Sequence, residues 1–118
     1  MKKKRNSENS FKFIFLNELN QIKERERIQI LGRLFLIDLT DNSAQIRTED
    51  GKIEIDISLI SNIQIKIHEY YQINGIFYKK NENQFQLKAV SMKCMKGINY
   101  SVFKFSIQKL REFFGNKN

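Results

Sequence analysis

The sequence has no proline, no tryptophan, a single cysteine and a single histidine. One cysteine cannot build a disulfide framework, which favours a reducing, intracellular location. Cys94 and His68 together cannot supply the roughly four ligands of a structural zinc site. The sequence also suggests no Cys–His pair, Ser–His–Asp triad, paired carboxylates or glycine-rich phosphate loop. We therefore expect a protein that is not an enzyme and that has no metal, cofactor or small-molecule substrate.

Long hydrophobic runs are missing as well. No apolar stretch approaches the ~18 residues that span a bilayer, so we expect no membrane association. The basic run Lys2–Arg5 is followed by polar residues rather than by an apolar segment, so no signal peptide is expected. We interpret residues 1–10 as a disordered basic tail, which is a nuclear-import signal, a phosphate-contacting arm or a featureless charged terminus.

The remaining composition is that of one folded domain. Hydrophobic residues make up 41% of the 118 residues and aromatic residues 12%, which argues for a globule rather than a disordered chain. The net charge is +8, and four of the 21 basic residues lie in the run Lys2–Arg5. The other 17 exceed the 13 acidic residues by only four. The body of the protein is mildly basic, which is compatible with a nucleic-acid partner.

Hydrophobic patterning predicts a β-rich domain over residues 11–98. Residues 11–23 begin with alternation and continue at helical spacing, which predicts an extended segment and a short helix. Five strands follow, at 26–39 with a bend or bulge at Gly32, at 44–49, at 52–57, at 69–80, and at 84–96 with a bulge at Ala89-Val90. Asp50-Gly51 is the turn of a hairpin, residues 58–68 are an ambiguous crossover, and Cys94 is expected to face inward as a packing residue.

This count and order predict the fold class. We expect a mainly β protein built as a five-stranded Greek-key barrel of the oligonucleotide/oligosaccharide-binding (OB) type, with a short N-terminal helix and an amphipathic C-terminal helix. The long first strand would be shared between the two halves of the barrel. Residues 99–118 would form a separate oligomerisation helix.

The C-terminal stretch VFKFSIQKLREFF, residues 102–114, holds seven large apolar residues, four of them phenylalanine. On a helical wheel the apolar residues fall into one stripe, a pattern typical of helices that pack against other helices. Phe105 falls outside this stripe, and we expect it either in the connection before the helix, with Ser106 as the cap, or against the barrel. The predicted partner interface consists of Val102, Phe103, Ile107, Leu110, Phe113 and Phe114. The alternative is that the stripe closes one end of its own barrel.

The order of these features resembles a known family. The chain has a short helix, a strand with Ile30-Leu31-Gly32-Arg33, a DG hairpin, a strand with Ile73-Asn74-Gly75-Ile76 and an amphipathic C-terminal helix. Over residues 13–114 it resembles the smallest subunit of replication protein A (RPA), the eukaryotic single-stranded-DNA-binding heterotrimer. The likeness extends to the small subunit of the TEB trimer that accompanies telomerase and, ranked below it, to that of the CST complex. The isoleucine-rich crossover and the basic N-terminal run depart from the better-known members.

The resemblance implies an association with two larger OB-fold subunits through a bundle of C-terminal helices, in the nucleus and at telomeric chromatin, with telomerase as a further partner. It assigns the helix contacts to Phe103, Ile107, Leu110 and Phe114. The function we expect is a non-catalytic small subunit that scaffolds a single-stranded-DNA-binding trimer. The alternative is an autonomous single-OB protein that binds single-stranded nucleic acid.

A direct contact with DNA would require aromatic platforms and cations, usually on the second and third strands of an OB barrel. The predicted outward residues there include Arg47 but are half acidic, and no aromatic residue lies between Phe35 and Tyr70. The other candidates are Tyr70, Tyr78, Lys79 and Lys80, for which half-buried sheet positions and a solvated turn are the favoured explanation. We therefore expect direct DNA binding to be weak or absent, with DNA held mainly by the partners.

Overall fold

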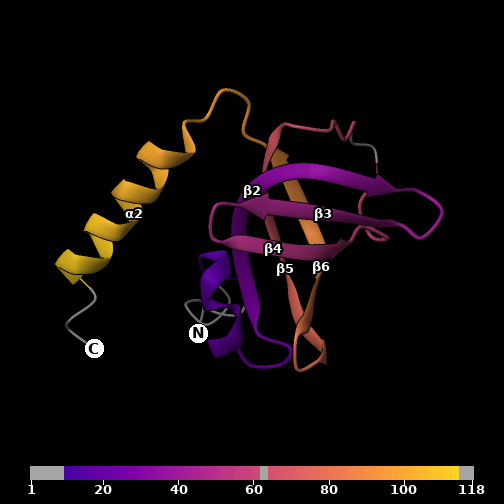
Figure 1. Ribbon diagram of the computed structural model, residues 1–118, viewed down its shortest axis with the longest axis horizontal. Coiled ribbons are helices and arrows are strands. Elements are labelled where there is room, and N and C mark those ends of the chain that lie inside the picture. Colours follow the sequence, from indigo (N-terminus) through magenta and orange to yellow (C-terminus); the bar gives the residue numbers. More distant parts are fainter. Residues whose placement is uncertain (1–9, 62–63, 115–118) are drawn as a thin grey trace, which may run out of the picture.

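Five strands close into a barrel in the computed structural model, which describes residues 10–61 and 64–114 (Figure 1). Residues 1–9, which include the predicted tail with Lys2–Arg5, lie outside the described residues, as do residues 115–118 of the predicted C-terminal unit. The elements in chain order are β1 (Lys12–Phe13), the 3₁₀ helix η1 (Leu16–Gln21), β2 (Arg27–Asp38), β3 (Ser43–Thr48), β4 (Gly51–Asp56), β5 (Tyr70–Asn81), β6 (Gln84–Cys94) and α2 (Tyr100–Phe114).

The long strand β2 closes the barrel by pairing on both sides. Residues 27–33 pair antiparallel with β5, and residues 33–38 pair antiparallel with β3. The remaining order runs from β3 through β4 and β6 to β5, with β4 and β6 parallel. This confirms the predicted fold class and the first strand shared between both halves of the barrel; the two-residue β1 adds a short parallel pairing with β2.

The irregularity in β2 does not lie at Gly32, as its glycine suggested. Gly32 is in regular register with Tyr71, and a Cβ atom at this position would collide with Ile46 Cγ2. The glycine is therefore required by the close approach of β3, not by a bulge. The register shifts between Leu34 and Leu36, which leaves Phe35 as the extra residue.

The other predicted strand features are confirmed. In the β3–β4 hairpin the alternating residues Ala44, Ile46, Ile53 and Ile55 are all buried in the core. In β6 the pairing moves from Ser91 opposite Asn74 to Ala89 opposite Gly75, so Val90 is bulged, as expected. Alternation along a half-buried strand is thus a reliable guide to its inner face here.

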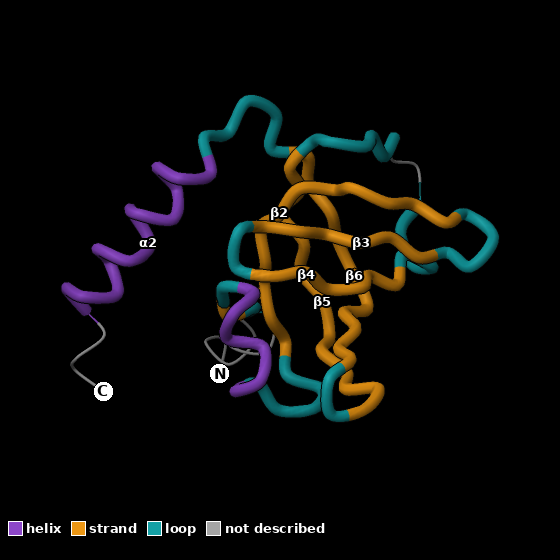
Figure 2. The backbone as a smooth tube through the Cα atoms, in the orientation of Figure 1, coloured by secondary structure: helices purple, strands orange, loops and turns teal. Residues whose placement is uncertain are grey.

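One end of the barrel is covered by η1, not by the C-terminal helix. Leu16 and Leu19 of η1 and the following Ile22 are each at most 6% exposed and belong to the main hydrophobic cluster. The Phe15 N–H donates to the Glu18 carboxylate at 2.8 Å, which closes the first turn of η1. Figure 2 shows η1 against the barrel and α2 beyond it, on the same side. The main hydrophobic cluster therefore contains no residue of α2, which contradicts the barrel-plug alternative.

The expectation for Cys94 was wrong, because its side chain is exposed. Cys94 lies opposite the fully buried Tyr71, so the parity of the strand was read correctly. It is, however, the last residue of β6, at the rim of the barrel, where it lines an open pocket with polar residues such as Gln64 and Lys66. An inward-facing position in a strand is buried only where other side chains cover that part of the barrel.

Candidate functional site

Helix α2 begins at Tyr100, where the side chain of Asn99 caps it. The Val102 N–H donates to Asn99 Oδ1 at 3.2 Å, and the Phe103 N–H donates to Asn99 O at 3.0 Å. Phe105 therefore lies inside the helix and is 59% exposed. Both expectations for Phe105 were wrong. It does not lie in the connection, because the helix starts at Tyr100 rather than at Ser106, and it does not pack against the barrel, because its side chain is exposed.

Aromatic contacts attach the first turn of α2 to the barrel. Tyr100 is buried and its ring stacks on that of Tyr70 at the start of β5, with centroids 5.8 Å apart. The ring of Phe103 meets the edge of Phe13 at 5.4 Å. Burial raises the pKa of the Tyr100 hydroxyl. The hydroxyl donates a hydrogen bond to the Asp50 carboxylate at 3.4 Å, and the negative charge of Asp50 raises the pKa further. This end of the helix is anchored by ring packing.

Ion pairs hold the rest of the helix. The Lys104 ammonium contacts Asp50 at 2.8 Å and Glu49 at 2.7 Å, and these two hydrogen-bonded carboxylates raise its pKa. One turn from the C-terminus, the Arg111 guanidinium binds both carboxylate oxygens of Glu18 in η1, at 2.6 and 3.1 Å, and also donates to Phe13 O at 3.1 Å. The side of α2 that meets the barrel therefore combines the packed rings of its first turn with two charged side chains farther along the helix.

The Glu18 carboxyl responds to this bidentate contact. Partial burial alone would raise its pKa, but the hydrogen bonds from Arg111 and from the Phe15 N–H, together with the positive charge of Arg111, lower the pKa below its ordinary value of 4.5. Glu18 thus closes η1 and ties α2 to it with the same two oxygens. The C-terminal half of α2 is therefore linked to η1 through this carboxylate.

The barrel takes only one edge of the predicted apolar stripe. Phe103 and Ile107 are half-buried on the side that also carries Lys104 and Arg111. The remaining large apolar side chains of α2 are more than half exposed, and these are Val102 (59%), Phe105 (59%), Leu110 (53%), Phe113 (72%) and Phe114 (55%). We call these five residues the open face of α2. Four of them belong to the predicted partner interface, and Phe105 is the one that sequence reasoning left out.

The predicted nucleic-acid contacts lie in two separate places. Tyr78, Lys79 and Lys80 are near the far end of β5, about 25 Å along the strand from Tyr70. The Lys80 ammonium is paired with Glu54 at 3.0 Å. Of the five candidates, Arg47 and Tyr70 line one pocket, together with other cationic and aromatic side chains.

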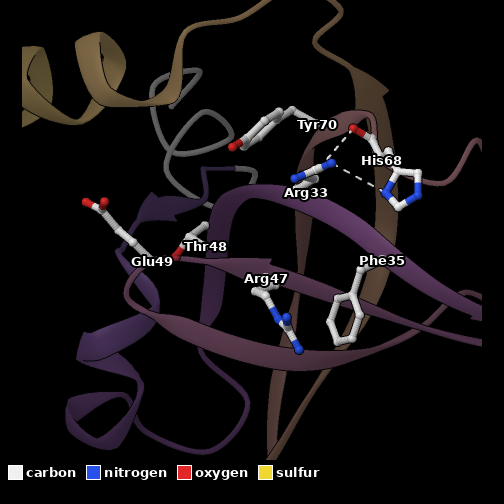
Figure 3. Close-up of a pocket in the computed structure, with 7 residues that line it drawn as sticks. All are labelled: Arg33, Phe35, Arg47, Thr48, Glu49, His68 and Tyr70. Carbon is white, nitrogen blue, oxygen red and sulfur yellow. Dashed lines mark hydrogen bonds between the residues drawn. The ribbon is translucent and has the colours of Figure 1, made fainter.

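That pocket is an open hollow of about 400 Å³ on the outer surface of β2 and β3 (Figure 3). It is lined by Arg33 and Phe35 of β2, by Arg47, Thr48 and Glu49 at the end of β3, and by His68 and Tyr70. We call it the β2–β3 pocket. The Arg47 guanidinium carbon lies 4.0 Å from the centre of the Phe35 ring, a cation–π contact.

The end of the crossover positions His68 beside Arg33. The His68 N–H donates to Leu34 O at 2.7 Å, and His68 has a φ of 78°, a left-handed conformation in which histidine is among the tolerated residues. Arg33 Nε donates to His68 O at 3.3 Å, and Arg33 Nη2 lies 3.5 Å from His68 Nδ1. Figure 3 shows these two contacts below the ring of Tyr70.

Sequence reasoning named Tyr70 but missed Phe35 and Arg33 as site residues, for an identifiable reason. The run Leu34–Ile37 is apolar at both parities and hides the outer face of the strand. The bulge resolves it, since Arg33 and Phe35 alternate outward around the buried Leu34. The alternation of buried and exposed residues before the bulge was therefore the sequence signal that could have identified this outer face.

The acidic groups of this surface are largely compensated. Glu49 is paired with Lys104 and Glu54 with Lys80, and the Asp56 carboxylate accepts the Ser58 N–H at 2.9 Å. Burial alone would raise the pKa of Asp56, but this hydrogen bond and the nearby charge of Lys88 lower it. The expectation of weak or absent direct DNA binding counted these carboxylates as unpaired charges.

Within residues 10–61 and 64–114, no helix is long and apolar enough to cross a membrane. The same part of the chain contains no group of three His, Cys, Asp or Glu side chains placed to hold a metal ion. The described residues thus form a barrel with an open pocket of cationic and aromatic side chains, and a helix with an open apolar face. These features define an OB-fold protein with an amphipathic C-terminal helix.

The family model described as telomere-capping, CST complex subunit (Ten1) matches residues 8–117, so the chain belongs to this family. The resemblance drawn from the sequence alone is thereby confirmed, and the match falls on the CST branch, which was ranked below the TEB trimer. No curated protein matches the sequence.

Solved structures share the fold at low sequence identity. A chain in the crystal structure of the S. pombe Stn1–Ten1 complex is 17% identical with a TM-score of 0.74, and the match covers 88% of this chain and 94% of that one. Telomere capping protein Ten1 from Saccharomyces pombe is also 17% identical with a TM-score of 0.74, over 87% and 99% of the two chains. A chain of U. maydis replication protein A bound to single-stranded DNA is 16% identical with a TM-score of 0.67, over 90% and 93%.

Proposed function

We propose that the protein is a non-catalytic small subunit that scaffolds a telomeric, RPA-like heterotrimer in the nucleus. Two larger OB-fold subunits would bind it through α2, telomerase would be a further partner of the complex, and single-stranded DNA would be held mainly by the larger subunits. Family membership supports the telomere-capping role. The observation that carries the scaffolding role is the open face of α2.

The energetics of the open face favour a helical partner. Each of its five side chains leaves more than half of its surface in water. Full burial of such a side chain is worth about 1.5–3 kcal/mol, so covering all five would supply on the order of 5 kcal/mol. The partner would therefore bury the surface that the barrel leaves uncovered.

The docking of α2 also favours this role. The ion pairs of Lys104 and Arg111 fix the helix beside the barrel with its apolar side outward, so a partner meets a helix that is already oriented. Preorganisation of this kind reduces the entropic cost of binding a partner. The structural likeness to a chain of the S. pombe Stn1–Ten1 complex is consistent with a protein partner for this chain.

The experiment is affinity purification of the tagged full chain from its own cells, comparing wild type with the double variant Leu110→Asp/Phe114→Asp. We expect the wild type to co-purify with two chains that contain OB folds, and the double variant to lose both. Both side chains are exposed, so the variant should keep the β-rich circular dichroism of the wild type. The matched control is Gln108→Asp, an exposed position on the polar side of the same helix.

Two outcomes would contradict the proposal. Retention of both partners by the double variant would show that α2 does not carry the association. A wild-type chain that purifies alone and binds single-stranded DNA tightly would instead favour the autonomous binder.

A further inference from the structure

We propose that the β2–β3 pocket binds one nucleotide of the single-stranded DNA held by the complex. The base would stack on the Phe35–Arg47 pair, and a phosphate would lie near Arg33. The choice of DNA as ligand rests on the proposed function. The site itself rests on the geometry of the pocket, which is separate from the open face of α2.

The stacking platform is already assembled. Phe35 is half-buried in the bulge of β2, and Arg47 is exposed above it with its guanidinium 4.0 Å from the ring centre. A guanidinium is planar and weakly hydrated, and nucleobases stack on its face as they do on aromatic rings. Tyr70, half-buried and stacked on Tyr100, adds a second ring to the same hollow. Rings held by packing lose little entropy when a base stacks on them.

The charges of the pocket suit a phosphate. Arg33 and Arg47 are both exposed on its floor, and its single carboxylate, Glu49, is 2.7 Å from the Lys104 ammonium. Figure 3 shows Glu49 pointing away from the two arginines. The two contacts that Arg33 makes with His68 involve two of the five N–H donors of a guanidinium. The lining is therefore net cationic, as a groove that tracks a nucleic-acid backbone requires.

The position of the pocket provides a route for a strand. Its volume of about 400 Å³ lies in the ~300–1,000 Å³ range of ligand sites. Glu49 and Tyr70 also line an adjoining hollow formed by residues 97–101, at the base of α2. A strand leaving the pocket would pass along this hollow toward the helix that we propose binds the larger subunits. The small subunit would then hold one nucleotide at the edge of a longer DNA path.

The test measures fluorescence anisotropy of a labelled single strand of about 15 nucleotides with the isolated full chain at about 50 mM salt. We expect measurable, salt-sensitive binding by the wild type. Phe35→Leu keeps the apolar bulk but removes the stacking ring, and should weaken binding about tenfold. Arg33→Ala should lower the slope of log K against log salt by about 0.7. Arg27→Ala is the control, since Arg27 is an exposed arginine at the other end of β2.

The outcomes separate this proposal from the scaffolding role. Unchanged DNA affinity of both Phe35→Leu and Arg47→Ala overturns it, as does the absence of any binding by the wild type. If Phe35→Leu is unstable, Arg47→Ala alone decides. Loss of the larger subunits by these variants with full DNA affinity would make the pocket a protein contact and also overturn it. Leu110→Asp/Phe114→Asp should bind the strand as the wild type does, so the two proposals can fail independently.

Discussion

Replacing Arg111 by methionine tests whether α2 is a docked helix or an integral part of the fold. The substitution removes the guanidinium that binds Glu18 at 2.6 and 3.1 Å and Phe13 O at 3.1 Å. It keeps an unbranched side chain of similar length to pack on Phe15, whose ring centre lies 4.8 Å from the guanidinium carbon. The change is therefore one of charge and hydrogen bonding more than of volume.

The magnitude follows from the exposure of the pair. Charge-assisted hydrogen bonds of buried groups contribute about 1.5–3 kcal/mol, whereas exposed ion pairs contribute at most about 1 kcal/mol. The Arg111 and Glu18 side chains are 39% and 27% exposed, so we expect about 1–2 kcal/mol. This free energy belongs to the docking of the helix end, because the barrel core is covered by η1 and not by α2.

The assay is amide hydrogen exchange along α2, combined with thermal unfolding. Loss of 1–2 kcal/mol of docking should speed exchange in residues 106–114 by about 5- to 30-fold, with little change in Tm. The control is Lys109→Met, which breaks a 3.5 Å pair with Glu112 whose members are 58% and 69% exposed, and should change neither quantity. Unchanged exchange in Arg111→Met would refute the anchoring role of this residue. A large drop in Tm would refute the independence of the barrel from α2.

Three further predictions concern the pH dependence of helix docking, the close approach of strands at Gly75 and the burial of two leucines. Because the folded pKa of Glu18 is lowered, its contribution to docking is fully present above pH 4.5 and is lost as the pH falls through the folded value; the protection factors of α2, which divide the intrinsic exchange rate at each pH by the observed rate, should therefore fall in acid for the wild type but not for Glu18→Gln. Gly75→Ala should reduce the free energy of unfolding by about 1–3 kcal/mol in urea titrations, because its Cβ would lie 2.5 Å from Lys88 O, and a variant as stable as the wild type would contradict that clash. Leu19→Ala should cost about 2–5 kcal/mol, since Leu19 is 3% exposed, whereas Leu110→Ala should leave the isolated chain within about 0.5 kcal/mol of the wild type; equal losses would show that the open face is part of the core.

The structure explains why some expectations for the helix succeeded and others did not. The spacing of Phe103, Ile107, Leu110 and Phe114 correctly indicated an amphipathic helix, because side-chain periodicity is a local property of the chain. It could not show that the barrel takes Phe103 and Ile107 while leaving Leu110 and Phe114 open. That division depends on Arg111 meeting Glu18, which lies 93 residues earlier.

The sequence by itself determined the strands, the bulge at Val90, the core residues of the β3–β4 hairpin and the family, because alternation and turn residues act over a few positions. Only the tertiary structure decided that Phe35, Arg47, Arg33 and Tyr70 line one pocket. Closing the barrel brings residues 33–35 of β2 beside residue 47 of β3 and residue 70 of β5. No local pattern records this proximity, since it arises from strand pairing between segments far apart in the chain.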